Sequence, residues 1–166
     1  MSAPTRYAAK EIKKLIERLN IVVADQNQYA RKLTRMVLMT IGAKSICEAA
    51  DGVAALDVFR TGNPDVAIMD WEMPLVSGRD LIRIVRSPGV FPKPDLPIIL
   101  LTAGADRLRV TEAIQLGVHE FLCKPTSPGA LRDRLASILV KPRPMVQIGK
   151  YYVPRLRRGA IQYVIE

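Results

Sequence analysis

The chain has 166 residues, of which 49% are hydrophobic, and it carries a formal net charge of +9 at neutral pH. This length and composition suit a single folded domain with short extensions, and they exclude wholesale disorder. No apolar run is long enough to span a membrane or to serve as a secretion signal, so we expect a cytoplasmic protein.

The rare residue types narrow the kinds of site that the chain can build. His119 is the only histidine, which argues against a histidine-based metal cluster or catalytic triad, and we expect it on a loop surface. Cys47 and Cys123 lie far apart in apolar segments and predict buried free thiols rather than a disulfide. Three methionines are expected to fill gaps in the core: Met36, Met39 and Met69.

Basic residues are spread along the chain and cluster only in the tail, at Arg155, Arg157 and Arg158. Dispersed charge is typical of a solvated surface that attracts acidic partners. The composition therefore does not favour nucleic-acid binding, which is kept only as a minor alternative for the tail.

The first predicted element is a helix within residues 4–19. Its apolar side chains recur at helical spacing between Lys and Glu residues, which indicates an amphipathic helix. Such a stripe has to pack against the main body of the protein or against a second copy.

From residue 20 onward, short apolar strands alternate with helices. The strands are predicted at 20–24, 45–49, 65–69, 97–101 and 120–123, and the helices at 28–41, 53–59, 78–86, 105–116 and 127–139. This alternation predicts a mostly parallel sheet that is covered by helices on both faces.

The composition changes at Val140. Pro142, Pro144 and Pro154 exclude a continuous helix there, and a short strand is predicted at 162–166. We interpret this stretch as an arm rather than as a domain.

Chemically active side chains stand where the predicted strands end. Asp25 follows the first strand, Asp70 the third, Thr102 and Ala103 the fourth, and Lys124 the fifth. In an open α/β sheet the functional site lies beyond the carboxyl ends of the strands. We therefore expect two carboxylates, a hydroxyl and an ammonium group to meet at one edge.

This set suits the transfer of a phosphoryl group to a carboxylate. A divalent cation held by carboxylates offsets the repulsion between two anionic reactants, and a lysine neutralises a further phosphoryl oxygen. The product is an aspartyl phosphate, whose added charge of about −1.5 to −2 can pull a hydroxyl-bearing loop inwards.

The segments VVADQNQYARKL, EAADGVAAL, AIMDWEMP, PIILLTAGAD and GVHEFLCKP resemble the receiver domains of bacterial response regulators. The resemblance spans most of residues 21–125 and implies a flavodoxin-like α/β sandwich with a parallel sheet in the order 2-1-3-4-5. It divides the chain into an N-terminal amphipathic helix (1–19), a receiver domain (20–140) and a C-terminal arm (141–166).

The resemblance also implies a function. The chain would be a single-domain, chemotaxis-receiver-like signalling protein, and not an enzyme. It would accept a phosphoryl group from a histidine kinase or histidine phosphotransfer protein and signal through protein contacts. The alternative is a pseudo-receiver that binds partners without phosphate. A phosphohydrolase is disfavoured because Glu72 stands where that chemistry usually wants an Asp.

Position by position, the resemblance makes Asp70 the phospho-acceptor, Thr102 the switch hydroxyl and Lys124 the phosphate-contacting base. Ala103 would offer a backbone N–H to the phosphoryl group. Phe121 stands where the family keeps an aromatic switch, although plain core packing explains an aromatic strand residue equally well. The bond between Lys124 and Pro125 is one that the family holds in cis.

The metal site departs from the family pattern. Asp25, Asp70 and the backbone carbonyl of Glu72 would hold Mg²⁺, but the family usually has two adjacent acids, with an Arg six places after the first. Asp25 and Arg31 fit that spacing, which puts Gln26 in the place of the second acid, where it can offer the metal only an amide oxygen. A register that starts at Ala24 fits less well. Since a carboxylate is missing in either register, we expect Mg²⁺ to bind weakly.

The tail resembles those of many alphaproteobacterial single-domain regulators, which end in an aromatic residue, a proline and a basic run. The corresponding stretch here is 151–158. The resemblance implies an arm that crosses onto a partner subunit and gives a homodimer, and the alternative is a flexible tail.

Overall fold

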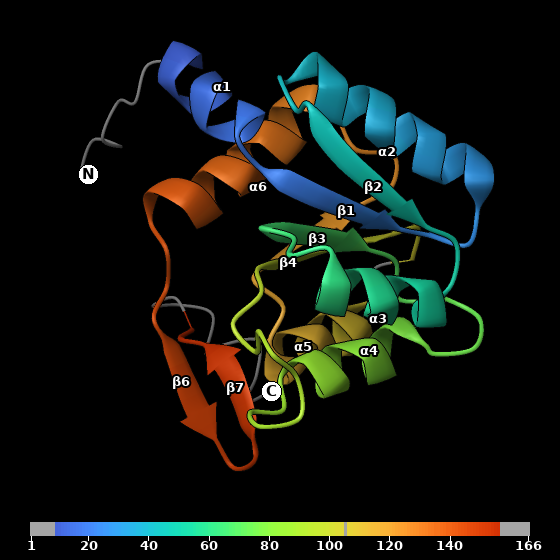
Figure 1. Ribbon diagram of the computed structural model, residues 1–166, viewed down its shortest axis with the longest axis vertical. Coiled ribbons are helices and arrows are strands. Elements are labelled where there is room, and N and C mark those ends of the chain that lie inside the picture. The colour runs from blue at the N-terminus through green and yellow to red at the C-terminus, as the bar shows by residue number, and fades with distance from the viewer. Residues whose placement is uncertain (1–8, 105, 157–166) are drawn as a thin grey trace.

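The computed structural model describes residues 9–104 and 106–156. Its centre is a parallel five-stranded sheet in the order β2-β1-β3-β4-β5, with a layer of helices on each face (Figure 1). The strands are β1 (Asn20–Ala24), β2 (Ser45–Ala49), β3 (Val66–Met69), β4 (Ile98–Thr102) and β5 (Glu120–Cys123). The predicted fold class and strand order are therefore confirmed.

One helical layer consists of α1 (Ala9–Glu17), α2 (Gln28–Thr40) and α6 (Pro128–Val140), and the other of α3 (Gly52–Thr61), α4 (Gly78–Val85) and α5 (Arg107–Leu116). Successive strand residues face opposite layers because side chains alternate along a strand. Ile21 and Val23 pack with the first layer, whereas Val22 and Ala24 pack with the second. Burial on both faces explains why the strands are continuous apolar runs.

The helices that follow the strands begin at capping residues. The side chains of Asn27, Asp51, Ser77, Asp106 and Ser127 each accept a hydrogen bond from the backbone N–H three residues later. Such caps satisfy donors that have no partner inside the helix. They also keep the connections at the carboxyl ends of the strands short, which fixes the loops that carry the candidate site.

The C-terminal arm contains a hairpin that the sequence did not predict. The strands β6 (Met145–Ile148) and β7 (Tyr151–Pro154) pair antiparallel. Val153 is buried, and the Tyr152 N–H donates to the backbone oxygen of Arg86 at 2.8 Å, so the hairpin packs on its own chain. The strand predicted at 162–166 lies outside the described residues.

Several burial predictions were wrong. Both cysteines are exposed, Cys47 because β2 is an edge strand and Cys123 because it ends β5 at the other edge. Met36 and Met39 lie exposed on the outer side of α2, and only Met69 is in the core. His119 is half-buried rather than exposed, and its Nδ1 lies 3.2 Å from the Arg86 guanidinium and accepts from Ile98 N at 3.3 Å.

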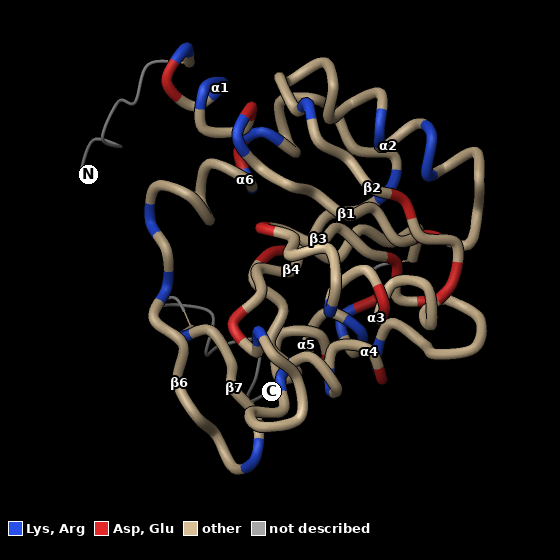
Figure 2. Tube along the Cα trace, viewed as in Figure 1, with Lys and Arg blue, Asp and Glu red and all other residues tan. Residues whose placement is uncertain are grey.

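Basic residues are dispersed over the surface as predicted, whereas Arg157 and Arg158 of the predicted tail cluster lie outside the described residues. Lys and Arg residues are spread over α1, α2 and the segment between α6 and β6 (Figure 2). Within the described residues, no helix is both long and apolar enough to cross a membrane.

Candidate functional site

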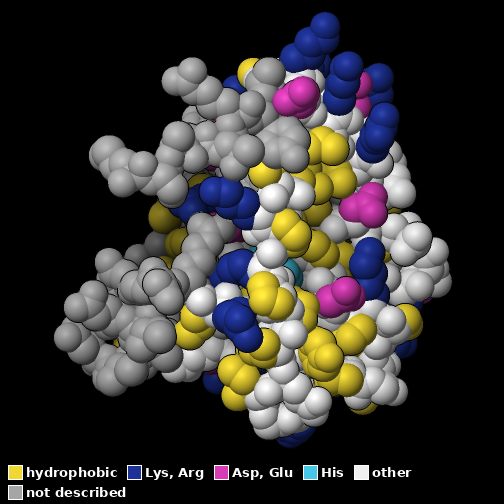
Figure 3. Space-filling view, turned by 90° about the vertical axis from the view of Figure 1, so that its left-hand side faces the viewer, with side chains coloured by type: hydrophobic (Ala, Val, Ile, Leu, Met, Phe, Trp, Pro, Cys, Tyr) yellow, Lys and Arg dark blue, Asp and Glu magenta, His cyan; other side chains and the backbone are white. Residues whose placement is uncertain are grey.

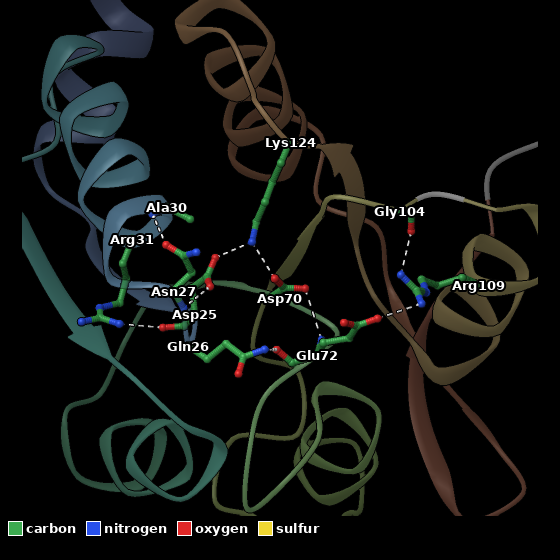
Figure 4. A network of polar contacts seen from close by, with 10 residues as sticks. All are labelled: Asp25, Gln26, Asn27, Ala30, Arg31, Asp70, Glu72, Gly104, Arg109 and Lys124. Carbon is green, nitrogen blue, oxygen red and sulfur yellow. Dashed lines mark hydrogen bonds and ion pairs between the residues drawn. The ribbon is translucent and has the colours of Figure 1, made fainter.

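The carboxyl ends of β1, β3 and β5 carry three charged side chains that are in direct contact (Figure 4). The parallel register aligns Ala24 with Met69, so Asp25 and Asp70 start the next loops side by side. The Lys124 ammonium donates to Asp70 Oδ2 at 2.5 Å and to Asp25 Oδ2. One lysine thus bridges two carboxylates from different loops.

The environment of this cluster keeps the lysine charged. Asp25 is only 4% exposed, and the Lys124 side chain is mostly covered. Burial lowers the pKa of the Lys124 amine, but hydrogen bonds and charges from Asp25 and Asp70 outweigh it and raise the pKa above its usual value. The ammonium form therefore persists at neutral pH.

The remaining carboxylate oxygens are held by backbone N–H groups. Asp25 Oδ1 accepts from Asn27 N at 2.8 Å, and Asp70 Oδ1 accepts from Glu72 N at 3.2 Å. Arg31, six places after Asp25, donates to the Asp25 backbone oxygen at 2.7 Å. Both aspartates are therefore fixed in orientation before any ligand is present.

Gln26 and Glu72 connect the loops after β1 and β3. Gln26 Nε2 donates to the Glu72 backbone oxygen at 3.2 Å, so Gln26 reaches the carbonyl expected to serve the metal. The Glu72 carboxylate turns away and pairs with Arg109 at 3.1 Å. Arg109 also donates to the Gly104 oxygen at 2.9 Å. Sequence reasoning missed Arg109, because an arginine in the first turn of a helix gives no sign of what it reaches.

Three other predicted site residues are Thr102, Ala103 and Phe121. Within the described residues, no hydrogen bond or ion pair joins their side chains to this cluster. Thr102 ends β4 and is buried, and its carbonyl accepts from Lys124 N at 2.9 Å. Ala103 is exposed in the next loop, and Phe121 is half-buried on β5 against the core beneath α3, α4 and α5. The peptide bond between Lys124 and Pro125 is cis, as the resemblance implied.

The metal ligands can be compared with what the fold supplies. Within residues 9–104 and 106–156, no group of three or more His, Cys, Asp or Glu side chains is arranged to hold a metal ion. Two carboxylates and the Glu72 carbonyl are oxygen donors of the type that Mg²⁺ prefers. These donors suit the ion chemically, but the set has one carboxylate fewer than the family pattern. Each group also already accepts a hydrogen bond from an N–H group.

Residues 21–136 of the sequence match the family model of the response regulator receiver domain. The chain belongs to the response regulator receiver domain family. The chemotaxis protein CheY of Pseudomonas aeruginosa is 32% identical over 120 residues, which cover 72% of this chain and 95% of that protein. Such relatives are signalling proteins of two-component and chemotaxis systems.

Solved structures agree with this membership. A putative response regulator from Chloroflexus aurantiacus is 28% identical, with a TM-score of 0.68, over 74% of this chain and 98% of that chain. The receiver domain of the Pseudomonas aeruginosa sensor histidine kinase PA1611 is 24% identical, with a TM-score of 0.63, over 71% and 94%. That receiver domain holds a magnesium ion in its active site cleft, and its likeness to this chain supports the fold alone.

Proposed function

We propose that this receiver domain accepts a phosphoryl group on Asp70 from the phosphohistidine of a kinase or phosphotransfer protein. The observation that carries the proposal is the contact of Lys124 with Asp70 and Asp25. This contact puts a fixed cation beside a carboxylate that has to attack an anionic phosphorus. Asp25 and Asp70 without a cation between them would repel both the incoming group and each other.

In the proposed reaction, an Asp70 oxygen forms a bond to phosphorus while the bond between phosphorus and the donor imidazole nitrogen breaks. The proton needed by the departing imidazole comes from the donor side or from water. Lys124 moves from the carboxylate to a phosphoryl oxygen, where its charge matters more as charge accumulates. The Glu72 N–H keeps Asp70 oriented throughout.

Asp25, Asp70 and the Glu72 carbonyl would hold Mg²⁺, and the ion would offset phosphoryl charge when bound. We expect weak binding because Gln26 replaces a carboxylate.

The switch that follows would use the end of β4. Thr102 is buried and pairs with Cys123, the residue before Lys124, and its hydroxyl would move towards a phosphoryl group on Asp70. The exposed Ala103 backbone would offer the N–H that draws this loop in. Phe121 pairs with Leu100 across β4 and β5, and its half-buried ring would turn inwards when Thr102 moves.

The donor would dock on the outer side of α2. Tyr29 is 80% exposed there, and three more exposed apolar side chains continue its stripe: Leu33, Met36 and Met39. A hollow between this helix and the loop after β5 is lined by Tyr29, Leu33, Lys124 and Pro125. An apolar helix that carries the phosphohistidine and packs on this stripe would stand close to the acceptor.

Incubation with a cognate kinase, or with acetyl phosphate and Mg²⁺, tests the proposal. The wild type should show a slower band in a phosphate-affinity gel, and Asp70→Asn should show none. Asp57→Asn, on α3, is the matched control and should behave as the wild type. An unshifted wild type under all donors would instead support the phosphate-independent module.

A homodimer through the C-terminal arm stays a prediction. Within the predicted arm stretch 151–158, Tyr151–Pro154 form β7 and pack on their own chain, and residues 157–166 lie outside the described structure.

A further inference from the structure

The cation side of the site contains a contact that the family pattern does not predict. Gln26 is exposed, yet its amide nitrogen lies 3.2 Å from the Glu72 backbone oxygen. The direction of this amide is fixed by chemistry, because a carbonyl oxygen accepts hydrogen bonds and an amide oxygen facing it would be repelled. The amide oxygen of Gln26 is therefore turned away from the carbonyl.

Each oxygen-bearing group that a divalent cation would use already accepts at least one hydrogen bond. Asp25 accepts from Asn27 N and from Lys124, and Asp70 accepts from Glu72 N and from Lys124. The Glu72 carbonyl accepts from Gln26. With two carboxylates and one ammonium, the cluster has a net charge of about −1. Its attraction for a cation is therefore about half of that exerted by two unpaired carboxylates.

We propose that Gln26 is a plug rather than a metal ligand: its amide N–H donates to the Glu72 carbonyl, and a divalent cation has to compete with that N–H for the same oxygen. The plug also ties the loop after β1 to the loop after β3, which carries both Asp70 and Glu72 (Figure 4). N–H donors thereby keep the acceptor Asp70 ordered, and the affinity of the receiver domain for the divalent cation is low. This inference rests on the proposed function, because it concerns the cation-binding site next to the proposed phospho-acceptor.

The plug and a ligand role make opposite predictions for removal of the side chain. A net hydrogen bond is worth about 0.5–1.5 kcal/mol, which corresponds to about a 2- to 10-fold change in an equilibrium constant. Gln26→Ala should therefore bind Mg²⁺ about 2- to 10-fold more tightly than the wild type. Gln26→Glu removes the donor and adds a carboxylate of the same size, and it should bind at least about 10-fold more tightly.

Calorimetric titration with MgCl₂ measures these affinities without any phosphoryl donor, and the fluorescence of Trp71, the only tryptophan, gives a second readout beside Asp70. Gln28→Ala, an exposed glutamine two residues away, is the control and should leave the affinity unchanged. Unchanged or weaker binding by Gln26→Ala would overturn the plug, as would Gln26→Glu that binds no better than the wild type.

Failure of this inference leaves the proposed function intact, because Asp70 is still tested by its own phosphorylation. Conversely, a domain that binds Mg²⁺ as described but never becomes phosphorylated would refute the function and keep the plug. Thermal unfolding of each variant shows whether a change in affinity reflects the site or the stability of the fold.

Discussion

The buried cations at the two ends of the sheet have different hydrogen-bond partners. At the carboxyl end, Lys124 is paired with the carboxylates of Asp25 and Asp70. At the amino end, the guanidinium of Arg86 is fully buried, and it donates to the Gly117 and Pro94 oxygens at 2.9 and 2.8 Å. Lys124 is therefore hydrogen-bonded to carboxylates, whereas Arg86 is hydrogen-bonded to neutral backbone oxygens and Asp95 acts on it through its charge.

The amino end also holds the C-terminal hairpin. Arg86 contacts His119 Nδ1 at 3.2 Å, and its backbone oxygen accepts from Tyr152 of β7. Arg143, just before the hairpin, donates to the His119 backbone oxygen. On this face, basic, acidic and apolar side chains surround a hollow that Arg143, Asp95 and His119 help to line (Figure 3).

This difference separates the part of the molecule that can respond from the part that holds it together. In the proposed function, a phosphoryl group on Asp70 would add negative charge next to Lys124 and compete with Asp25 and Asp70 for its ammonium group. At the amino end, Arg86 is held by neutral backbone oxygens, and its own backbone oxygen accepts from Tyr152 of the hairpin. Burial lowers the pKa of Arg86 to about 9, which still leaves it protonated at neutral pH.

The largest effect is expected from Arg86→Met. The substitution removes the buried cation that joins α4, the loop before β4, the end of α5 and the start of β5, and it leaves two carbonyls without donors. Breaking a buried polar network of this kind costs about 3–5 kcal/mol of unfolding free energy. Urea denaturation measures this cost. A loss below about 1 kcal/mol would show that the amino end is not the rigid half of the molecule.

A smaller and pH-dependent effect is expected at His119. Burial, together with the charges of Arg86 and Arg143, lowers the pKa of His119 to about 3, against about 6.5 in the unfolded chain. The unfolded state therefore binds the proton first, and stability falls as the pH drops from about 6.5 towards 3. Between pH 7 and pH 4.5 this histidine alone should cost about 2–3 kcal/mol.

His119→Asn keeps an acceptor near the position of Nδ1 and removes the titration. Its stability relative to the wild type should therefore improve as the pH falls. Parallel pH profiles of the two proteins, followed by urea denaturation, would argue against a buried neutral histidine at the amino end.

The smallest effect on stability is expected at the carboxyl end, from Arg109→Ala. The pair of Arg109 and Glu72 is partly exposed, with the Glu72 side chain at 66%, and such pairs contribute about 1 kcal/mol or less. Thermal unfolding should therefore change little. A loss as large as that of Arg86→Met would erase the distinction between the two ends.

The fold and the centre of the site could be predicted because they depend on local patterns. Apolar runs alternating with amphipathic helices determine a parallel sheet, and parallel strands bring residues at their carboxyl ends to one edge. Asp25, Asp70 and Lys124 are each the first polar residue after a strand, so their contact needed no knowledge of loop conformation.

What was missed depends on where side chains point across loops. The direction of the Gln26 amide, the reach of Arg109 to Glu72 and the burial of His119 are set by partners distant in sequence. The hairpin was missed because its two strands have four residues each and lie in a proline-containing stretch. Met36 and Met39 were misjudged because helical spacing shows that a stripe exists, but not what covers it.

The central claim is that Asp70 is the phosphoryl acceptor. Borohydride reduction converts an aspartyl phosphate into homoserine, and peptide mass spectrometry then locates the modified residue. After incubation with a phosphodonor and Mg²⁺, we predict homoserine at position 70 and at no other aspartate. Homoserine at another position, or none in a protein that has taken up phosphate, would contradict the account.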